Sequence, residues 1–247
     1  MSHAVDDGLL TPSASSDPYP LFAVLRAEDP VHYSEVHRAW LLTRYADVSA
    51  AFANKAFSND RVRPLLAARR ERGGSQASER LLALMSDWMV VSDPPAHTRL
   101  RKLAAGAFKG QRITAMDGQI TALVDELLDA LVRGPATADL ISEVAYPLPA
   151  TVIATMLGAP VADRDRFRKW SDELALVAFG TGGEARVDRH ERALHGLREM
   201  DAYFRELIAR RRREPGEDML TAMMAGDESD HDRLSGDELV AMCALLL

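Results

Sequence analysis

Apolar residues recur every three or four positions along much of this chain, and that periodicity is the strongest constraint on its fold class. Such spacing places side chains on one face of an α-helix, so it predicts amphipathic helices. One clear stretch, which ends at Gly134-Pro135, carries Ile120, Leu123, Val124, Leu127, Leu128 and Leu131. A second, within residues 186–213, carries Leu197, Met200, Phe204, Leu207 and Ile208.

Strand signals are confined to the front of the chain. Residues 31–34 and 40–43 are short and rich in β-formers, and residues 35–39 separate them. Shorter helices are expected at residues 163–177 and 218–224. The pattern therefore predicts a mainly α fold with a small β-hairpin sheet near the N-terminus.

One helix start, in residues 92–101, carries two cations on one edge. Asp93 is suited to cap the helix, and Pro94 fits its first position, where no amide hydrogen is missed. His97 and Arg101 are four residues apart and therefore lie on the same face. An apolar stripe that includes Leu100 adjoins them. This edge suits an apolar ligand with acidic substituents, and the competing interpretation is a surface helix with two solvated cations.

The same segment resembles a motif of the cytochrome P450 family, the haem-thiolate monooxygenases. Its residues match the pattern D-P-P-x-H-T-R-L-R of the C-helix in soluble bacterial members. Residues 29–45 resemble the family's first β-hairpin, residues 46–52 the helix that follows it, and residues 138–160 the region of the E-helix. The resemblance covers residues 17–247 and implies the N-terminal half of the cytochrome P450 fold.

The resemblance also implies a single incomplete domain over residues 1–247, with residues 1–16 as a disordered tail. Cys243 is the only cysteine, and it lacks the surroundings Phe-x-x-Gly-x-x-x-Cys-x-Gly that present the family's iron ligand. We interpret it as a small buried residue on a helix. Ser235 and Glu238 open that helix as a capping box, and Leu234 and Leu239 form a hydrophobic staple. We expect an N-terminal fragment that ends within the central I-helix, lacks the C-terminal half with its cysteine loop, and is inactive alone.

For the full-length parent, the resemblance implies a haem-dependent monooxygenase that inserts one atom of dioxygen into a small organic substrate. The cofactor is haem b, an iron protoporphyrin, and His97 and Arg101 bind its propionates. Val90 and Leu245 match positions that line the distal pocket, and Leu176 and Val177 are candidates for its roof; ordinary core packing is the alternative for all four. No catalytic residue and no metal ligand is expected within this chain.

The implied electron donors are a ferredoxin and its reductase. Four basic residues are expected to point outward and to dock an acidic donor, unless they are only solvated: Arg99, Lys102, Lys109 and Arg112. A formal net charge of −7 argues against nucleic acid as a partner. The sequence contains no run of about 18 apolar residues, the length that a membrane-spanning helix needs. The first 16 residues do not resemble a signal peptide. With one cysteine, these features predict a cytoplasmic protein.

Two polar segments are expected to be loops with a functional role. Residues 61–87 are weakly patterned, and in the family the equivalent stretch caps the substrate cavity, so we expect a mobile entrance there. Residues 179–184 carry three glycines. No strand precedes these glycines and no Lys-Ser or Lys-Thr follows them, so a flexible lid fits better than a phosphate loop.

Two other functions remain open. The first is a catalytically inactive relative that serves as a partner protein, for example a glycosyltransferase activator. The retained cations at His97 and Arg101 count against it, because a protein freed from haem has less reason to keep them. The second is an unrelated helical binding module, which leaves the motif unexplained. The identity of the substrate is not readable from these residues.

Overall fold

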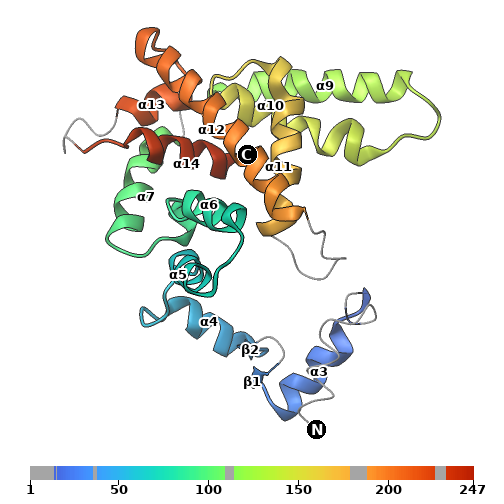
Figure 1. Cartoon of the computed structure of the whole chain (residues 1–247). Helices are drawn as coiled ribbons and strands as arrows, with labels where there is room; N and C mark the ends of the chain where they lie inside the picture. The colour runs from blue at the N-terminus through green and yellow to red at the C-terminus, as the bar shows by residue number, and fades with distance from the viewer. Residues whose placement is uncertain (1–13, 15, 36–37, 109–113, 179–187, 226–231) are drawn as a thin grey trace. The chain divides into compact units, whose positions relative to one another are not determined.

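The computed structural model describes residues 14, 16–35, 38–108, 114–178, 188–225 and 232–247, with only the backbone at 176–178. The chain divides into two units, Met1–Ser58 and Asn59–Leu247 (Figure 1). The single incomplete domain stays a prediction, and nearly all of the expected N-terminal tail and the whole lid at residues 179–184 lie outside the described residues.

The first unit contains the predicted hairpin. Helix α3 (Tyr19–Glu28) leads into strands β1 (Val31–Ser34) and β2 (Ala39–Leu42), and α4 (Tyr45–Ala53) follows. The strands are antiparallel and pair Tyr33 with Trp40. The two rings meet edge to face with centroids 5.1 Å apart, a cross-strand contact that stabilises this register. The prediction of a small N-terminal hairpin followed by a helix is confirmed.

Helices are the only regular elements among the described residues of the second unit. Its elements are α5 (Val62–Arg72), α6 (Gln76–Met85), η1 (Met89–Val91), α7 (Ala96–Ala107), α9 (Asp117–Arg133), η2 (Ile141–Ala145), α10 (Pro147–Met156), η3 (Val161–Asp163), α11 (Arg164–Ala178), α12 (Arg189–Arg213), α13 (Met219–Ala225) and α14 (Gly236–Leu246).

The core of this unit is built around α12, which packs against α11, α6 and α14 (Figure 1). All five apolar residues that the periodicity assigned to its inner face are buried. Phe204 stacks on Phe167 of α11 with ring centroids 6.1 Å apart, and Trp170 lies beside them. Because aromatic side chains bury large areas, this cluster contributes strongly to the packing of α11 on α12.

Helix α9 has the predicted position but not a buried face. It spans 17 residues, and none of them is buried. Leu128 and Val132 are exposed, and Ile120, Leu123 and Val124 are only half-buried. The apolar period correctly predicted a helix here, but it did not say what covers the stripe.

The expectation of a loop at residues 61–87 is wrong, because α5 and α6 occupy most of this segment, whereas its role as a mobile entrance stays a prediction. Gly73 ends α5 with φ 69°, a left-handed conformation that glycine adopts without steric cost. Ser75 then caps α6 by accepting a hydrogen bond from the amide of Ser78 at 3.2 Å. Gly73 and Ser75 therefore mark the end of one helix and the start of the next.

Helix α14 starts as the sequence predicts. The Ser235 hydroxyl oxygen accepts from the Glu238 amide at 3.2 Å, and the Glu238 carboxylate accepts from the Ser235 amide at 2.8 Å. Cys243 lies on this helix with 0% exposure, so its interpretation as a buried apolar residue is confirmed. Among the described residues, no helix combines the length and apolar character that crossing a bilayer requires.

Candidate functional site

The helix that carries His97 and Arg101 starts two residues later than predicted. Pro95, not Asp93, precedes its first residue, and no side chain caps it. Because a residue before proline is disfavoured in the α region, Pro94 is a poor first helical residue ahead of Pro95. The roles given to Asp93 as cap and to Pro94 as first helical residue are therefore wrong.

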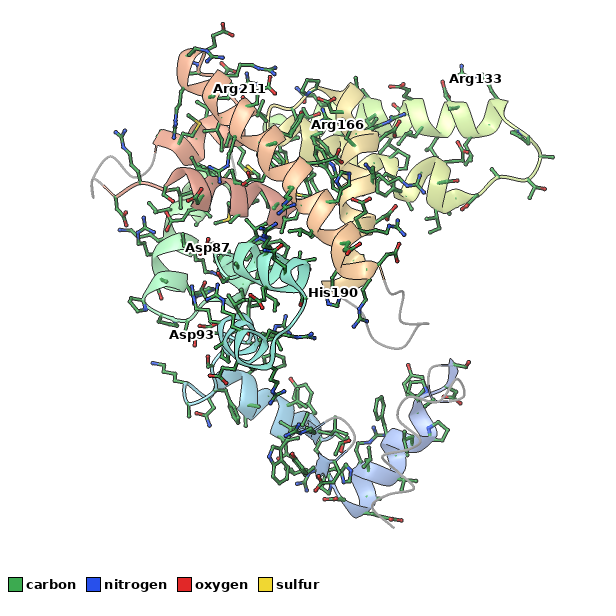
Figure 2. All side chains as sticks on the ribbon, in the orientation of Figure 1. Asp87, Asp93, Arg133, Arg166, His190 and Arg211 are labelled. Atoms are coloured by element: carbon green, nitrogen blue, oxygen red, sulfur yellow. The ribbon has the colours of Figure 1, made fainter. Side chains whose placement is uncertain are left out.

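Asp93 instead stabilises the segment just before the helix (Figure 2). Its carbonyl oxygen accepts from the amide of His97 at 3.0 Å, and its carboxylate accepts from the amide of Asn59 at 2.8 Å. The Asn59 side-chain amide also donates to the carbonyl oxygen of Val90 at 2.6 Å. Asn59 thus links η1 to the start of α7. Sequence reasoning missed it, because a lone asparagine in a loop carries no pattern.

His97 and Arg101 lie one turn apart on α7, as predicted. The opposite stripe of the helix is buried through Leu100 and Leu103. His97 is half-buried and Arg101 is exposed. Within the described ranges, neither cation is within ion-pair distance of a carboxylate. Together they form an edge that can bind two anionic groups.

The four residues predicted to line a substrate pocket lie on three elements. Val90 lies in η1 with 40% of its surface exposed, which is high for an apolar side chain. Leu245 is half-buried in the last turn of α14. Leu176 and Val177 lie in the last turn of α11, where only the backbone is described. Their roles in substrate binding stay predictions.

Arg99 does not project freely from α7, so the expectation that it points outward is wrong. Its Nε donates to both oxygens of Asp232, at 3.0 and 2.8 Å, and its Nη1 donates to Glu238 at 2.6 Å. The sequence could not show these partners, because they are more than 130 residues away. Lys102 is exposed, whereas Lys109 and Arg112 lie outside the described residues.

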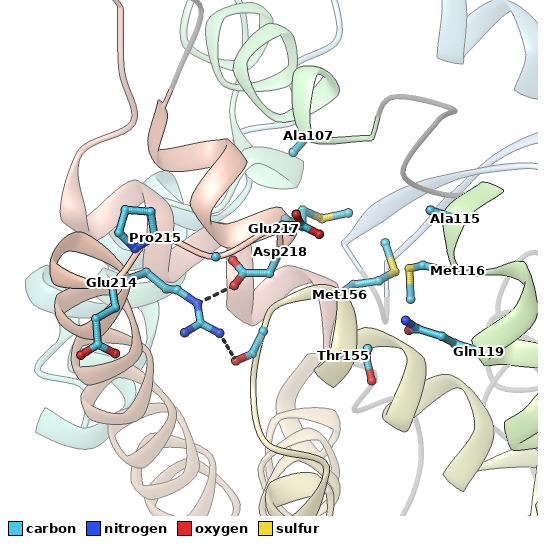
Figure 3. A pocket seen from close by; sticks show the side chains of 14 residues that line it. Ala107, Ala115, Met116, Gln119, Thr155, Met156, Glu214, Pro215, Glu217 and Asp218 are labelled. Atoms are coloured by element: carbon cyan, nitrogen blue, oxygen red, sulfur yellow. Dashed lines mark hydrogen bonds and ion pairs between the residues drawn. The ribbon is translucent and has the colours of Figure 1, made fainter.

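A cavity of about 1210 Å³ opens near the C-terminal end of α7 (Figure 3). Ala107, Met116, Met156 and the turn between α12 and α13 line it, and its described lining contains no residue of the predicted site. Arg211, the one arginine among the described lining residues, is already bound.

Arg211 bridges the carboxylate of Asp218 and the carbonyl oxygen of Gly158, the latter at 2.8 Å. Gly158 has φ 70°, and a Cβ there would lie 2.3 Å from the Asp218 carboxylate. Position 158 therefore requires glycine. Arg211 stabilises the contact between the end of α10 and the start of α13. Among its described lining residues the cavity offers no available cation, in contrast to the edge formed by His97 and Arg101.

Comparison with known proteins identifies the fold. No family model matches the chain. It is 35% identical over 247 residues to cytochrome P450 monooxygenase PikC of Streptomyces venezuelae, covering 98% of this chain and 55% of that protein. It is 38% identical over 234 residues to the vitamin D(3) 25-hydroxylase of Pseudonocardia autotrophica, covering 94% and 53%. The chain spans about half the length of the curated relatives it matches.

Solved structures agree with these relatives. The crystal structure of CalO2 superposes with a TM-score of 0.78 and 30% identity, covering 96% of this chain and 56% of that one. P450BioI, crystallised in complex with an acyl carrier protein ligated to hexadec-9Z-enoic acid, gives a TM-score of 0.80 at 26% identity, covering 96% and 58%. The hairpin and the helices that follow it are those of the N-terminal half of the cytochrome P450 fold.

By sequence and by structure, the chain belongs to the cytochrome P450 family. The resemblance drawn from the segment around His97 is therefore confirmed. The assignment of His97 and Arg101 to propionate binding stays a prediction.

Proposed function

We propose that the whole protein is a haem-dependent monooxygenase that inserts one atom of dioxygen into a small organic substrate. The names of the relatives support this class, since PikC is a monooxygenase and two others are a vitamin D(3) 25-hydroxylase and a 6-deoxyerythronolide B hydroxylase. The observation that carries the proposal is the edge of α7 on which His97 and Arg101 lie without a carboxylate partner in the described chain.

This edge fits haem b. The two propionates of the porphyrin are anionic and its ring is apolar, so they suit two cations one turn apart on the border of a buried stripe. Arg101 can hold a carboxylate with two parallel hydrogen bonds, because its guanidinium is a planar fork. His97 can donate from its ring. Bound haem supplies the iron that activates oxygen, and this chain's residues hold and orient it.

Cys243 is unsuited to act as the iron ligand. Burial, reinforced by the negative charge of Asp218, raises the pKa of its thiol to about 12. The Cys243 side chain is also 0% exposed and lies within the hydrophobic core of this unit, so its sulfur is not open to a porphyrin. We therefore expect the 247-residue polypeptide to give no band near 450 nm with carbon monoxide after reduction, and such a band would contradict this view.

Substrate contact is assigned to Val90, Leu176, Val177 and Leu245. The partial exposure of Val90 leaves its side chain open to an apolar ligand. Leu245 in α14 is likewise only half-buried. The proposed electron donors are a ferredoxin and its reductase. Arg99 is excluded from the docking surface because its hydrogen-bond donors are occupied.

Haem retention in the whole protein tests the proposal. Arg101→Ala removes the fork, and we expect about a tenfold or greater rise in the rate of haem transfer to apomyoglobin, since hydrogen bonds to charged groups contribute about 1.5–3 kcal/mol. His97→Ala should give a smaller rise in the same direction.

Arg133→Ala is the matched control, because Arg133 is also an exposed helical arginine and lies at the far end of α9 (Figure 2). Its haem transfer rate should equal that of the parent. If Arg101→Ala releases haem no faster than Arg133→Ala does, α7 does not bind the propionates and the proposed function loses its main support.

A further inference from the structure

Arg99 uses its whole guanidinium to bind one short segment at the start of α14. Nε and Nη1 bind Asp232 and Glu238, as described above, and Nη2 donates to the carbonyl oxygen of Arg233 at 2.9 Å. The side chain keeps 36% exposure, so the contact lies at the boundary between core and solvent. Three partners on one planar group fix both its position and its plane.

The position of Arg99 on α7 connects its contact with α14 to the orientation of His97 and Arg101. Arg99 lies two residues after His97 and two residues before Arg101, which corresponds to a rotation of roughly 200° around the helix. The residue that binds α14 and the two that form the open edge therefore lie on opposite sides of the helix. Turning the helix about its axis would displace both cations at once.

The α14 segment is itself well anchored. The Glu238 carboxylate closes the capping box with Ser235. Its burial opposes ionisation, but hydrogen bonds from Arg99 and Ser235 outweigh that effect and lower its pKa. The hydrogen bonds of Arg99 to the carboxylates of Glu238 and Asp232 in turn raise the pKa of Arg99. The contact is thus a charged pair at neutral pH, with its acidic partner held by a helix start.

A second arginine binds the same turn from another helix. Arg205 of α12 donates to Asp237 at 2.6 Å and to Asp201 at 2.8 Å. Both arginines thus bind two carboxylates and contact the first turn of α14 or the residues just before it. Only Arg99 belongs to the helix that carries His97 and Arg101, so Arg205 provides an internal comparison.

We propose that Arg99 is a positioning residue for the cofactor edge: by clasping Asp232, Arg233 and Glu238, it fixes the rotation of α7 at which His97 and Arg101 face the same ligand. This inference rests on the proposed function. It assigns to Arg99 a role that depends on His97 and Arg101, and not an independent contact with haem.

The first experiment compares Arg99→Ala with Arg205→Ala in the whole protein, by haem transfer to apomyoglobin and by thermal unfolding. Both variants should lower the melting temperature by similar amounts, because each frees charges at the same turn of α14. Only Arg99→Ala should raise the haem transfer rate, by roughly tenfold, the size expected from losing one oriented charged hydrogen bond. A merely structural role would give the two variants the same transfer rate.

A double-mutant cycle with Arg101→Ala tests whether Arg99 acts through Arg101. Because His97 remains in that background, the effect of Arg99→Ala should shrink there, and it should vanish when His97→Ala is added to Arg101→Ala. If the two rate increases multiply, Arg99 contributes independently and the proposal is overturned.

Two gentler variants guard against a folding defect in Arg99→Ala. Arg99→Lys keeps the charge but loses the fork, so its transfer rate should fall between those of the parent and Arg99→Ala. The double variant Asp232→Asn with Glu238→Gln removes both acidic partners while glutamine can still close the capping box, and it should reproduce Arg99→Ala.

The outcomes separate the two proposals. If Arg101→Ala releases haem at the parental rate, the proposed function itself loses its main support. Fast release from Arg101→Ala combined with parental rates in Arg99→Ala and in the Asp232–Glu238 double variant would leave that function intact and refute the role of Arg99.

Discussion

Helices α12 and α9 carry the same kind of apolar periodicity, yet one buries its stripe and the other buries no side chain. Around α12 lie α11, α6 and α14, which enclose the stripe from several directions. Helix α9 packs, within the described chain, mainly against α10 and η2. The difference teaches that a period of 3.6 predicts a helix with an apolar face, whereas burial depends on which other elements lie beside that face.

A large effect is expected from one truncation made on both helices. Leu207 of α12 is 2% exposed, so Leu207→Ala should lower the free energy of unfolding by about 3 kcal/mol. Leu127 of α9 is half-buried, and Leu127→Ala should cost less than about 1 kcal/mol, because little packing is lost. Urea denaturation of both variants measures the contrast. Equal losses would mean that the stripe of α9 is covered as fully as that of α12.

A smaller effect of opposite sign on the two helices is expected at glycine. A Cβ at Gly196 of α12 would lie 2.4 Å from the carboxylate of the buried Glu173, so Gly196→Ala should destabilise by about 1–3 kcal/mol. A Cβ at Gly118 of α9 meets nothing within 4 Å, and Gly118→Ala should stabilise by roughly 0.5 kcal/mol. Thermal unfolding of the two variants checks both signs, and destabilisation by Gly118→Ala would refute the open environment of α9.

Much of the fold followed from local signals in the sequence. The hairpin, the capping box at Ser235 and the inner face of α12 depend on residues close together in the chain, and all three were predicted. The start of α7 was misplaced because the restriction that one proline imposes on the residue before it outweighed the cap signal of Asp93. The short helices α5 and α6 were missed because Gly73, which ends α5, and Ser75, which caps α6, were taken as parts of one loop.

The site was only partly predictable, for a different reason. His97 and Arg101 share an edge because they are one turn apart, which the sequence states directly. The partners of Arg99 lie in a distant segment, and Asn59 joins Val90 and Asp93 only through the folded backbone. Long-range pairing of this kind leaves no mark in the local spacing, so Arg99 was interpreted as an outward docking residue.

The pH dependence of stability under alkaline conditions tests the burial of Cys243 in α14. The pKa of the Cys243 thiol rises from 9.0 to about 12 on folding, chiefly through burial. Below pH 9 the thiol is protonated in both states, so this residue adds no pH dependence. Between pH 9 and pH 12 the unfolded chain loses the proton first, and stability should fall by up to about 1.4 kcal/mol per pH unit.

Cys243→Ala is the control for that titration, since it removes only this ionisation. Urea denaturation at several alkaline pH values should show a shallower decline for the variant than for the parent. Tyr203, whose pKa is also raised by burial and by its hydrogen bond to Asp163, acts equally in both proteins. Parallel declines would show that the thiol is accessible to solvent, and α14 would then not be packed as described.

The smallest effect is expected where a valine becomes threonine, a change that keeps the shape and adds a hydroxyl. Val132 at the end of α9 is 84% exposed, so Val132→Thr should change the free energy of unfolding by less than about 0.5 kcal/mol. Val240 of α14 is buried, and there the same change should cost about 1–3 kcal/mol, because the hydroxyl loses its water. Urea midpoints of the two variants give the comparison. A cost above 1 kcal/mol at Val132 would show that the end of α9 is covered in solution, and the contrast with α12 would then be one of degree.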